Sequence, residues 1–218
     1  MQRLELQVKS IERVEKHGEV FTSQKEVIAM CDLVKQETER IESRFLEPAC
    51  GTGNFLAEVL NRKLEKVTKR YKRSQLEFEK YSLTALMSLY GVDILSDNVK
   101  ECQDRLFDIW YKNYHALYGN GVDLDCIKSA KFVLKKNILA GDALTMEMLD
   151  GQPIKFSEWS FVIGDNIKRR VFTFNELLKP KCYEVDLFSD EDDVKKSSIA
   201  KPEKVYPITS FRKVYLYE

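Results

Sequence analysis

The chain has 218 residues, of which 44% are hydrophobic and 32% are charged, so a packed globular domain is expected and a disordered chain is excluded. Its 35 basic and 35 acidic residues give a formal net charge of zero. This balance removes the whole-chain argument for a nucleic-acid-binding protein, although a local basic face could still contact phosphates.

Cysteine usage and the absence of long apolar runs indicate the compartment. The five cysteines include no Cys-x-x-Cys pair, which favours a reducing environment and argues against a zinc site. The first residues lack an apolar signal core, and no run approaches the roughly 18 apolar residues of a membrane span. We therefore expect a cytoplasmic protein that does not engage a membrane and holds no metal.

The first quarter of the chain predicts a helix and then a strand. Residues 1–17 form a charged lead-in, after which Thr22 or Ser23 can cap a helix. The apolar residues spaced as one stripe of that helix are Val27, Ile28, Cys31 and Val34. Residues 44–47 read as the first strand, which is short because Pro48 removes a backbone donor.

Residues 54–89 follow a helical pattern that we divide into two helices near residues 72–74. The window 62–73 is rich in Lys and Arg and could meet phosphates, but a solvated helix face is the more ordinary explanation. Residues 90–95 predict a second strand, and Ser96 is placed to cap a helix that runs to about Tyr118.

The remaining elements predict the fold class. We expect a third strand from Phe132 to Leu139 and a fourth over residues 161–164. Strands that alternate with helices indicate an α/β fold with a doubly wound, mostly parallel sheet. Half-exposed strands are then expected at residues 171–174 and 213–217.

The C-terminal part changes in composition. An acidic run at 190–193 and a Lys/Ser/Pro-rich loop at 195–204 separate the two last predicted strands. We expect residues 1–178 to form one domain and residues 179–218 to form a short β-rich extension of it.

The segment from Phe45 to Phe55 is the most informative in the chain. It reads as a strand end, a turn of small residues and a helix entrance, and Gly51 and Gly53 would let a ligand lie against the backbone there. Glu47 adds a carboxylate that suits an amino or hydroxyl donor, and the Lys-Ser/Thr of a P-loop is absent. The pattern favours an adenosyl or amino-acid ligand over a nucleoside triphosphate.

Three acidic residues follow the first three predicted strands: Glu47, Asp93 and Asp142. Ligands of such sheets bind beyond the carboxyl ends of the strands, so we expect these side chains to meet. Asp93 would bind ribose hydroxyls and Asp142 an adenine amino group, with Ile94 and Ala143 against the ring. Each acid alone would more often be a helix cap or a turn residue, but three at successive strand ends favour a ligand.

A nicotinamide cofactor is disfavoured by spacing. The acidic residue of a dinucleotide fold follows its glycine turn by about 20 residues, whereas Asp93 follows this one by about 40. Cys50 stands at a helix start, where a thiol can be activated, but its neighbours indicate a small filler of the ligand turn.

The order of four segments, at residues 18–22, 47–55, 91–94 and 141–144, resembles the amino-terminal half of the DNA adenine-N6 methyltransferases of restriction–modification systems. The likeness covers roughly residues 17–166 and implies a Rossmann-like domain that binds S-adenosylmethionine. Thr22 would meet the methionine carboxylate and Glu47 its amino group. The residues that the resemblance and the pattern together assign to the cofactor are Phe21, Thr22, Glu47, Pro48, Ala49, Cys50, Gly51, Gly53, Phe55, Asp93, Ile94, Asp142 and Ala143.

One part of the family pattern is altered. These enzymes carry an Asn or Asp, two prolines and an aromatic after the fourth strand, and these residues hold a flipped adenine. The corresponding positions here are Asp165, Asn166, Ile167 and Lys168. Asp165 or Asn166 could still orient an acceptor amine and are the candidate catalytic residues, but the proline pair and the stacking ring are missing.

Three functions are consistent with this pattern. The first is an S-adenosylmethionine-dependent methyltransferase that acts on adenine in DNA. The second is a non-catalytic cofactor-binding or accessory subunit of a DNA restriction–modification system. The third is a methyltransferase with an RNA, protein or small-molecule acceptor. The chain after residue 166 is too short for an ordinary target-recognition domain, so DNA binding would use a separate recognition subunit.

Overall fold

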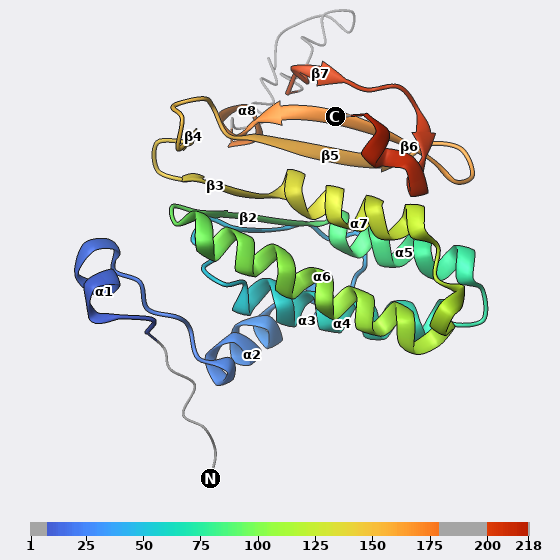
Figure 1. Cartoon of the computed structure of the whole chain (residues 1–218), viewed down its shortest axis with the longest axis horizontal. Coiled ribbons are helices and arrows are strands. Elements are labelled where there is room, and N and C mark those ends of the chain that lie inside the picture. The colour runs from blue at the N-terminus through green and yellow to red at the C-terminus, as the bar shows by residue number, and fades with distance from the viewer. Residues whose placement is uncertain (1–7, 179–199, 218) are drawn as a thin grey trace, which may run out of the picture.

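The computed structural model describes residues 8–178 and 200–217. The acidic run predicted at 190–193 and residues 195–199 of the loop predicted at 195–204 lie outside these residues. The described chain is a mixed α/β protein with two sheets, and Figure 1 shows them as neighbouring layers.

The first sheet is mostly parallel and has the strand order β1-β2-β3-β4. Its parallel strands are β1 (Phe45–Glu47), β2 (Leu89–Asp93) and β3 (Ile138–Asp142), and the two-residue β4 (Glu147–Met148) runs antiparallel to β3. Glu47 pairs with Gly91, and Asp93 pairs with Ala140. The carboxyl ends of the three parallel strands therefore lie at one edge, as the sequence predicts.

Helices connect these strands and supply most of the core. Their bounds are α1 Ile11–His17, α2 Gln24–Leu33, α3 Lys35–Thr38, α4 Asn54–Tyr71, α5 Gln75–Met87, α6 Ser96–Tyr118 and α7 Leu124–Asn137, with the short η1 Gly119–Gly121 before α7. The predicted break between α4 and α5 is confirmed, because Ser74 caps α5 by accepting from the backbone of Glu77.

The second sheet is antiparallel and is built from β5 (Lys155–Phe161), β6 (Asn166–Thr173), β7 (Lys204–Val205) and β8 (Thr209–Ser210). It packs against the parallel sheet, because Tyr90 of β2 donates to the carbonyl of Ser157 at 3.0 Å and its ring meets Phe156 edge-on. In Figure 1 this sheet lies on one side of β2 and β3, with α4 and α6 on the other. Helix α8 (Phe174–Leu178) follows β6.

The expectation that residues 161–164 form a fourth parallel strand is wrong. Phe161 ends β5, which pairs antiparallel with β6, and residues 162–165 form the hairpin turn. Short apolar runs do not encode their pairing partner, and here the partner is the next strand along the chain.

Other expectations on single elements also need correction. Residues 132–137 end helix α7, and the third strand begins only at Ile138. Leu95, and not Ser96, is the N-cap of α6. Residues 213–217 belong mostly to the 3₁₀ helix η2 (Phe211–Leu216), where Phe211 and Val214 are buried at a spacing of one turn.

The predicted stripe of α2 is only half buried. Val27 and Cys31 are fully buried, whereas Ile28 and Val34 are 40% and 43% exposed.

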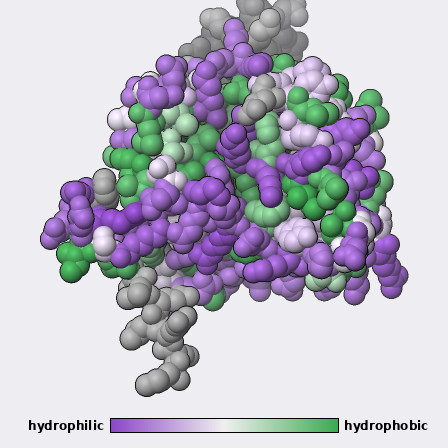
Figure 2. Space-filling view, viewed as in Figure 1, coloured by the Kyte–Doolittle hydropathy of each residue, from purple (hydrophilic) through white to green (hydrophobic). Residues whose placement is uncertain are grey.

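None of the described helices combines the length and the apolarity that a bilayer crossing requires. On the face seen in Figure 2, hydrophilic side chains run between the hydrophobic patches and keep them apart.

Candidate functional site: a cavity at the carboxyl edge of the parallel strands

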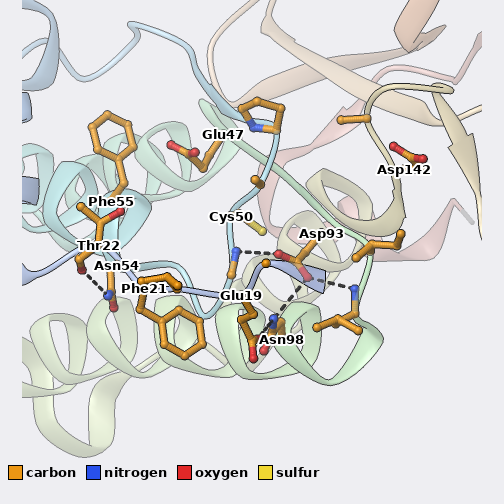
Figure 3. Close-up of a pocket in the computed structure, with 18 of the residues that line it drawn as sticks. Glu19, Phe21, Thr22, Glu47, Cys50, Asn54, Phe55, Asp93, Asn98 and Asp142 are labelled. Carbon is orange, nitrogen blue, oxygen red and sulfur yellow. Dashed lines mark hydrogen bonds between the residues drawn. The ribbon is translucent and has the colours of Figure 1, made fainter. Parts of the chain in front are cut away.

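A cavity of about 580 Å³ lies at the edge where the three parallel strands end. Four segments line it, at residues 18–22, 47–51, 93–95 and 141–144, and side chains from the start of α4, α6 and from α2 complete its wall. Figure 3 shows these residues around the hollow. The cavity therefore occupies the place where ligands bind in parallel α/β sheets.

The three strand-terminal carboxylates all line this cavity. Glu47 ends β1, Asp93 ends β2 and Asp142 ends β3, and each contributes to the same wall. Figure 3 shows Asp93 between the other two. The structure thus brings together the acids that the sequence predicts to meet.

The carboxylate of Asp93 joins both neighbouring loops. Its Oδ2 accepts a hydrogen bond from the backbone N–H of Gly51 at 2.8 Å. Its Oδ1 accepts from the backbone N–H of Leu95 at 2.9 Å and from the amide of Asn98 at 3.2 Å. A carboxylate offers about four acceptor sites, so Asp93 keeps capacity for one further donor in the cavity.

Glu47 differs from Asp93 in having no hydrogen-bond or ion-pair partner among the described residues. Its side chain is half-buried at the cavity wall, and burial raises the pKa of its carboxyl above the ordinary value. An unpartnered, partly desolvated acid is costly unless a donor satisfies it. The position is suited to an amino group or another cationic part of a ligand.

Asp142 has a local structural role as well as a place in the wall. Its Oδ1 accepts from the backbone N–H of Leu144 at 2.8 Å, which forms a turn of the kind that Asp favours. Ala143 and Leu144 follow it along the cavity, and the side chain of Leu144 is 92% exposed. This side of the cavity is consequently open and apolar.

The glycine turn is shaped by two close approaches. Gly51 has φ +51°, and a Cβ there would lie 3.1 Å from the ring of Phe21. Gly53 has φ +83°, and a Cβ there would lie 2.6 Å from Sγ of Cys102. Gly51 lines the cavity, whereas Gly53 allows α4 to pack on α6 and does not line it.

The segment before α2 forms the opposite wall. Phe21 and Thr22 line the cavity, as expected, and the carbonyl of Thr22 accepts from the amide of Asn54 at 3.0 Å. This bond fastens the segment to the first residue of α4. The other predicted residues that line the cavity are Pro48, Ala49, Cys50, Phe55, Ile94 and Ala143.

Cys50 is a packing residue in this structure. The residue is 5% exposed, and a hydrogen bond with Cys102 together with burial raises the pKa of its thiol far above the ordinary value. Such a thiol is a poor nucleophile. The interpretation of Cys50 as a filler of the ligand turn is therefore favoured.

Three residues that the sequence pattern did not indicate as site residues also line the cavity: Glu19, Asn54 and Asn98. The side chain of Glu19 is 7% exposed and forms an ion pair with Arg13. The hydrogen bond from Arg13 lowers the pKa of the Glu19 carboxyl, and the amide of Asn98 adds to this effect. Their positions in the sequence could have indicated them as site residues. Glu19 lies inside the segment 18–22, and Asn98 lies in the first turn of the helix after the second strand.

The charge of the lining is one-sided. Its carboxyl side chains are Glu19, Glu47, Asp93 and Asp142, and no Lys or Arg of the described chain lines the cavity. A phosphate group would meet carboxylates there without a cation to balance it. The lining favours a ligand that carries positive charge and hydroxyl donors.

Asp165 and Asn166 lie away from this cavity. Asp165 is in the β5–β6 turn, 3.7 Å from the ammonium of Lys80, and Asn166 pairs with Ser210. Figure 1 shows this turn at the opposite end of the molecule from the β3–β4 connection, which borders the cavity. The expected catalytic placement rested on a fourth parallel strand, and because β5 runs the other way the structure does not bring these residues to the site.

The comparisons with protein-family models, with curated proteins and with solved structures found no match for this chain. Among the described residues, no cluster of three or more His, Cys, Asp or Glu side chains could hold a metal ion.

Proposed function

We propose that this chain binds S-adenosylmethionine in a Rossmann-like domain and serves in the methylation of adenine N6 in DNA. The observation that carries the proposal is the meeting of Glu47, Asp93 and Asp142 in one cavity, to whose lining the described residues contribute no Lys or Arg. The cavity volume of about 580 Å³ falls within the range of small-molecule and cofactor sites. The sulfonium of this cofactor gives it the positive charge that such a wall favours.

The ligand would lie across the ends of the three strands. Asp93 would accept from a ribose hydroxyl, Asp142 from the adenine amino group and Glu47 from the amino group of the methionine part. Thr22 would contact the carboxylate of the same methionine part. Each of these side chains lines the cavity, and the unpartnered state of Glu47 supports the assignment of a ligand amine to it.

Methyl transfer from a sulfonium depends mainly on alignment. The donor methyl and the acceptor nitrogen must lie in line at near-contact distance, and a site that holds both reactants supplies most of the rate enhancement. In this proposal the chain's own residues hold the donor, and an acceptor amine enters from the open side near Leu144.

A non-catalytic role is the second candidate, and the position of Asp165 and Asn166 favours it. These residues pair with Lys80 and Ser210 outside the cavity. The chain would then bind the cofactor as an accessory subunit, and another subunit would supply the acceptor-binding groups. An RNA, protein or small-molecule acceptor is consistent with the same cofactor site.

One labelled compound separates these functions. S-adenosylmethionine with a tritiated methyl group is incubated with the chain, and both retained label and label transferred to adenine-containing DNA are counted. Retention with transfer supports the methyltransferase, and retention without transfer supports the accessory role. The proposal fails if the chain retains no label at concentrations well above those of ordinary cofactor affinity.

A further inference from the structure

The buried side chain of Asn98 forms hydrogen bonds both to residues of the cavity and to the N-terminal helix α1. Its side chain is 1% exposed and lines the cavity from the first turn of α6. Its amide nitrogen donates to Glu19 at 2.6 Å and to Asp93 at 3.2 Å. Its amide oxygen accepts from Lys9 at 2.9 Å and from Arg13 at 3.1 Å.

The chemistry of these four partners fixes the orientation of the amide. Carboxylates accept hydrogen bonds, and ammonium and guanidinium groups only donate them. A flipped amide would place its oxygen against Glu19 and Asp93 and its nitrogen against Lys9 and Arg13. Every one of the four contacts would then be repulsive, so only one orientation is compatible with the surroundings.

This amide lets two carboxylates share one wall of the cavity. Glu19 and Asp93 each receive one of its N–H groups, which reduces the repulsion between them. The guanidinium of Arg13 offsets the negative charge of these carboxylates, because it contacts Glu19, Asp97 and Asn98. Hydrogen bonds to charged groups are about twice as strong as neutral ones, so this network fixes side-chain positions firmly.

The same network holds α1 on the molecule. No described residue of α1 is buried, and its contacts to α6 are polar. Arg13 bonds to Asp97 at 2.7 Å, and Lys9 just before α1 bonds to Glu101 at 2.6 Å. The position of α1 and the position of the cavity carboxylates therefore depend on the same amide.

We propose that Asn98 is a positioning residue for the cofactor: it sets Asp93 and Glu19 toward the ribose hydroxyls and makes cofactor affinity depend on the docking of α1. This inference rests on the proposed function. Asn98 would affect the affinity for the ribose part through Asp93 and Glu19. Helix α1 would contribute to binding through the same network, although α1 itself does not line the cavity.

The test compares two buried asparagines. Asn98→Asp keeps the shape of the side chain but replaces its two N–H donors with a third acid beside Glu19 and Asp93. Asn137→Asp is the matched control, because Asn137 is also fully buried and hydrogen-bonded, to Met87 and Trp159, but lies outside the cavity. The probe is S-adenosylmethionine, and calorimetry gives its affinity at several pH values.

At neutral pH we expect Asn98→Asp to weaken binding about 10-fold to 100-fold, as the loss of a charge-assisted hydrogen bond would. The ratio of wild-type to variant affinity should shrink as the pH falls, because a protonated acid regains one donor. The charged groups facing this position are Glu19 and Asp93 on the cavity side and Lys9, Arg13, Asp97 and Glu101 on the outer side. A purely structural role would give a ratio that does not change with pH.

Arg13→Met is the second variant, since it alters an exposed helix and leaves the buried amide in place. We expect it to weaken binding by about 3-fold to 10-fold, and the effect to disappear with a cofactor analogue that lacks the ribose hydroxyls. The inference is overturned if wild type binds the cofactor and Asn98→Asp and Arg13→Met bind it equally well. Absence of binding by wild type would instead overturn the proposed function, and the inference with it.

Discussion

The backbone N–H of Gly51 donates a 2.8 Å hydrogen bond to the carboxylate of Asp93, across 42 positions in the sequence. This bond joins the turn after β1 to the end of β2, so the glycine turn and the acid that follows the second strand form one rigid rim. Because Gly51 and Asp93 also line the cavity, loss of this bond should lower both the stability of the fold and the affinity for a ligand.

The first prediction concerns Asp93. Asp93→Asn keeps the shape but places an N–H group where one of the two carboxylate oxygens now accepts. We expect a loss of about 1 to 3 kcal/mol in stability and at least a tenfold loss in S-adenosylmethionine affinity. Thermal denaturation and calorimetry measure the two effects.

Asp123→Asn is the control for this variant. Asp123 also caps a backbone N–H, that of Cys126 at 2.8 Å, but it does not line the cavity. This change should lower stability without altering cofactor affinity. Equal affinity losses in both variants would contradict a binding role for Asp93.

The second prediction concerns Gly53. Gly53→Ala forces an L residue into φ +83° and brings its Cβ within 2.6 Å of Cys102 Sγ. We expect a destabilisation of about 2 to 4 kcal/mol, from backbone strain together with overpacking. Gly151→Ala separates the two causes, because Gly151 has a similar φ of +78° and open space around it. If both variants lose the same stability in chemical denaturation, the contact between α4 and α6 is not as tight as described.

The third prediction concerns Glu47, whose carboxyl has a pKa raised by burial. A carboxyl whose pKa is higher in the folded than in the unfolded state costs stability as the pH rises through that interval. Glu47→Gln should therefore stabilise the ligand-free protein at neutral pH and weaken cofactor binding.

The pH dependence of binding follows from the same shift. Wild-type affinity for S-adenosylmethionine should fall as the pH is lowered from neutrality, because protonation of Glu47, whose pKa burial raises, removes the charge that faces the ligand amine. Glu47→Gln should remove this component of the pH profile, whereas Glu65→Gln, at an exposed position of α4, should retain it. A Glu47→Gln variant that binds as tightly as wild type at neutral pH would exclude the assigned contact.

The fourth prediction concerns the attachment of the C-terminal segment. Arg212 of η2 forms a salt bridge with Glu79, whose side chain is 0% exposed and also accepts from Tyr114. Arg212→Met would leave a buried acid without its cation and should cost about 3 kcal/mol. Lys155→Met removes a surface pair with Glu203 and should cost less than about 1 kcal/mol. Denaturant titrations of the two variants should differ accordingly.

The sequence predicts those parts of the fold that local signals determine. The helix break at Ser74 and the turn around Gly51 depend on capping and on backbone freedom, and both are found where the sequence places them. The apolar run at residues 132–139 predicts a strand, but such a run fits the end of a helix equally well, and only residues 138 and 139 belong to β3.

Pairing over long distances is not encoded in this local way. Gly164, with φ +58°, and the Asp and Asn after it are typical of a turn, but they do not specify which strand β5 pairs with. The structure does not bring Asp165 to the cavity, because β5 turns back against β6. Glu19 and Asn98 are 79 positions apart and become site residues only through their hydrogen bond. A motif can locate the acids at strand ends, but the partners that orient those acids emerge only from tertiary structure.

A crystal structure of the chain with S-adenosylmethionine tests the central claim most directly. We expect the ribose hydroxyls within hydrogen-bond distance of Asp93, the adenine beside Asp142 and the methionine amine against Glu47. A ligand bound elsewhere, or a cavity that stays empty at saturating cofactor, would contradict the assignment of this site.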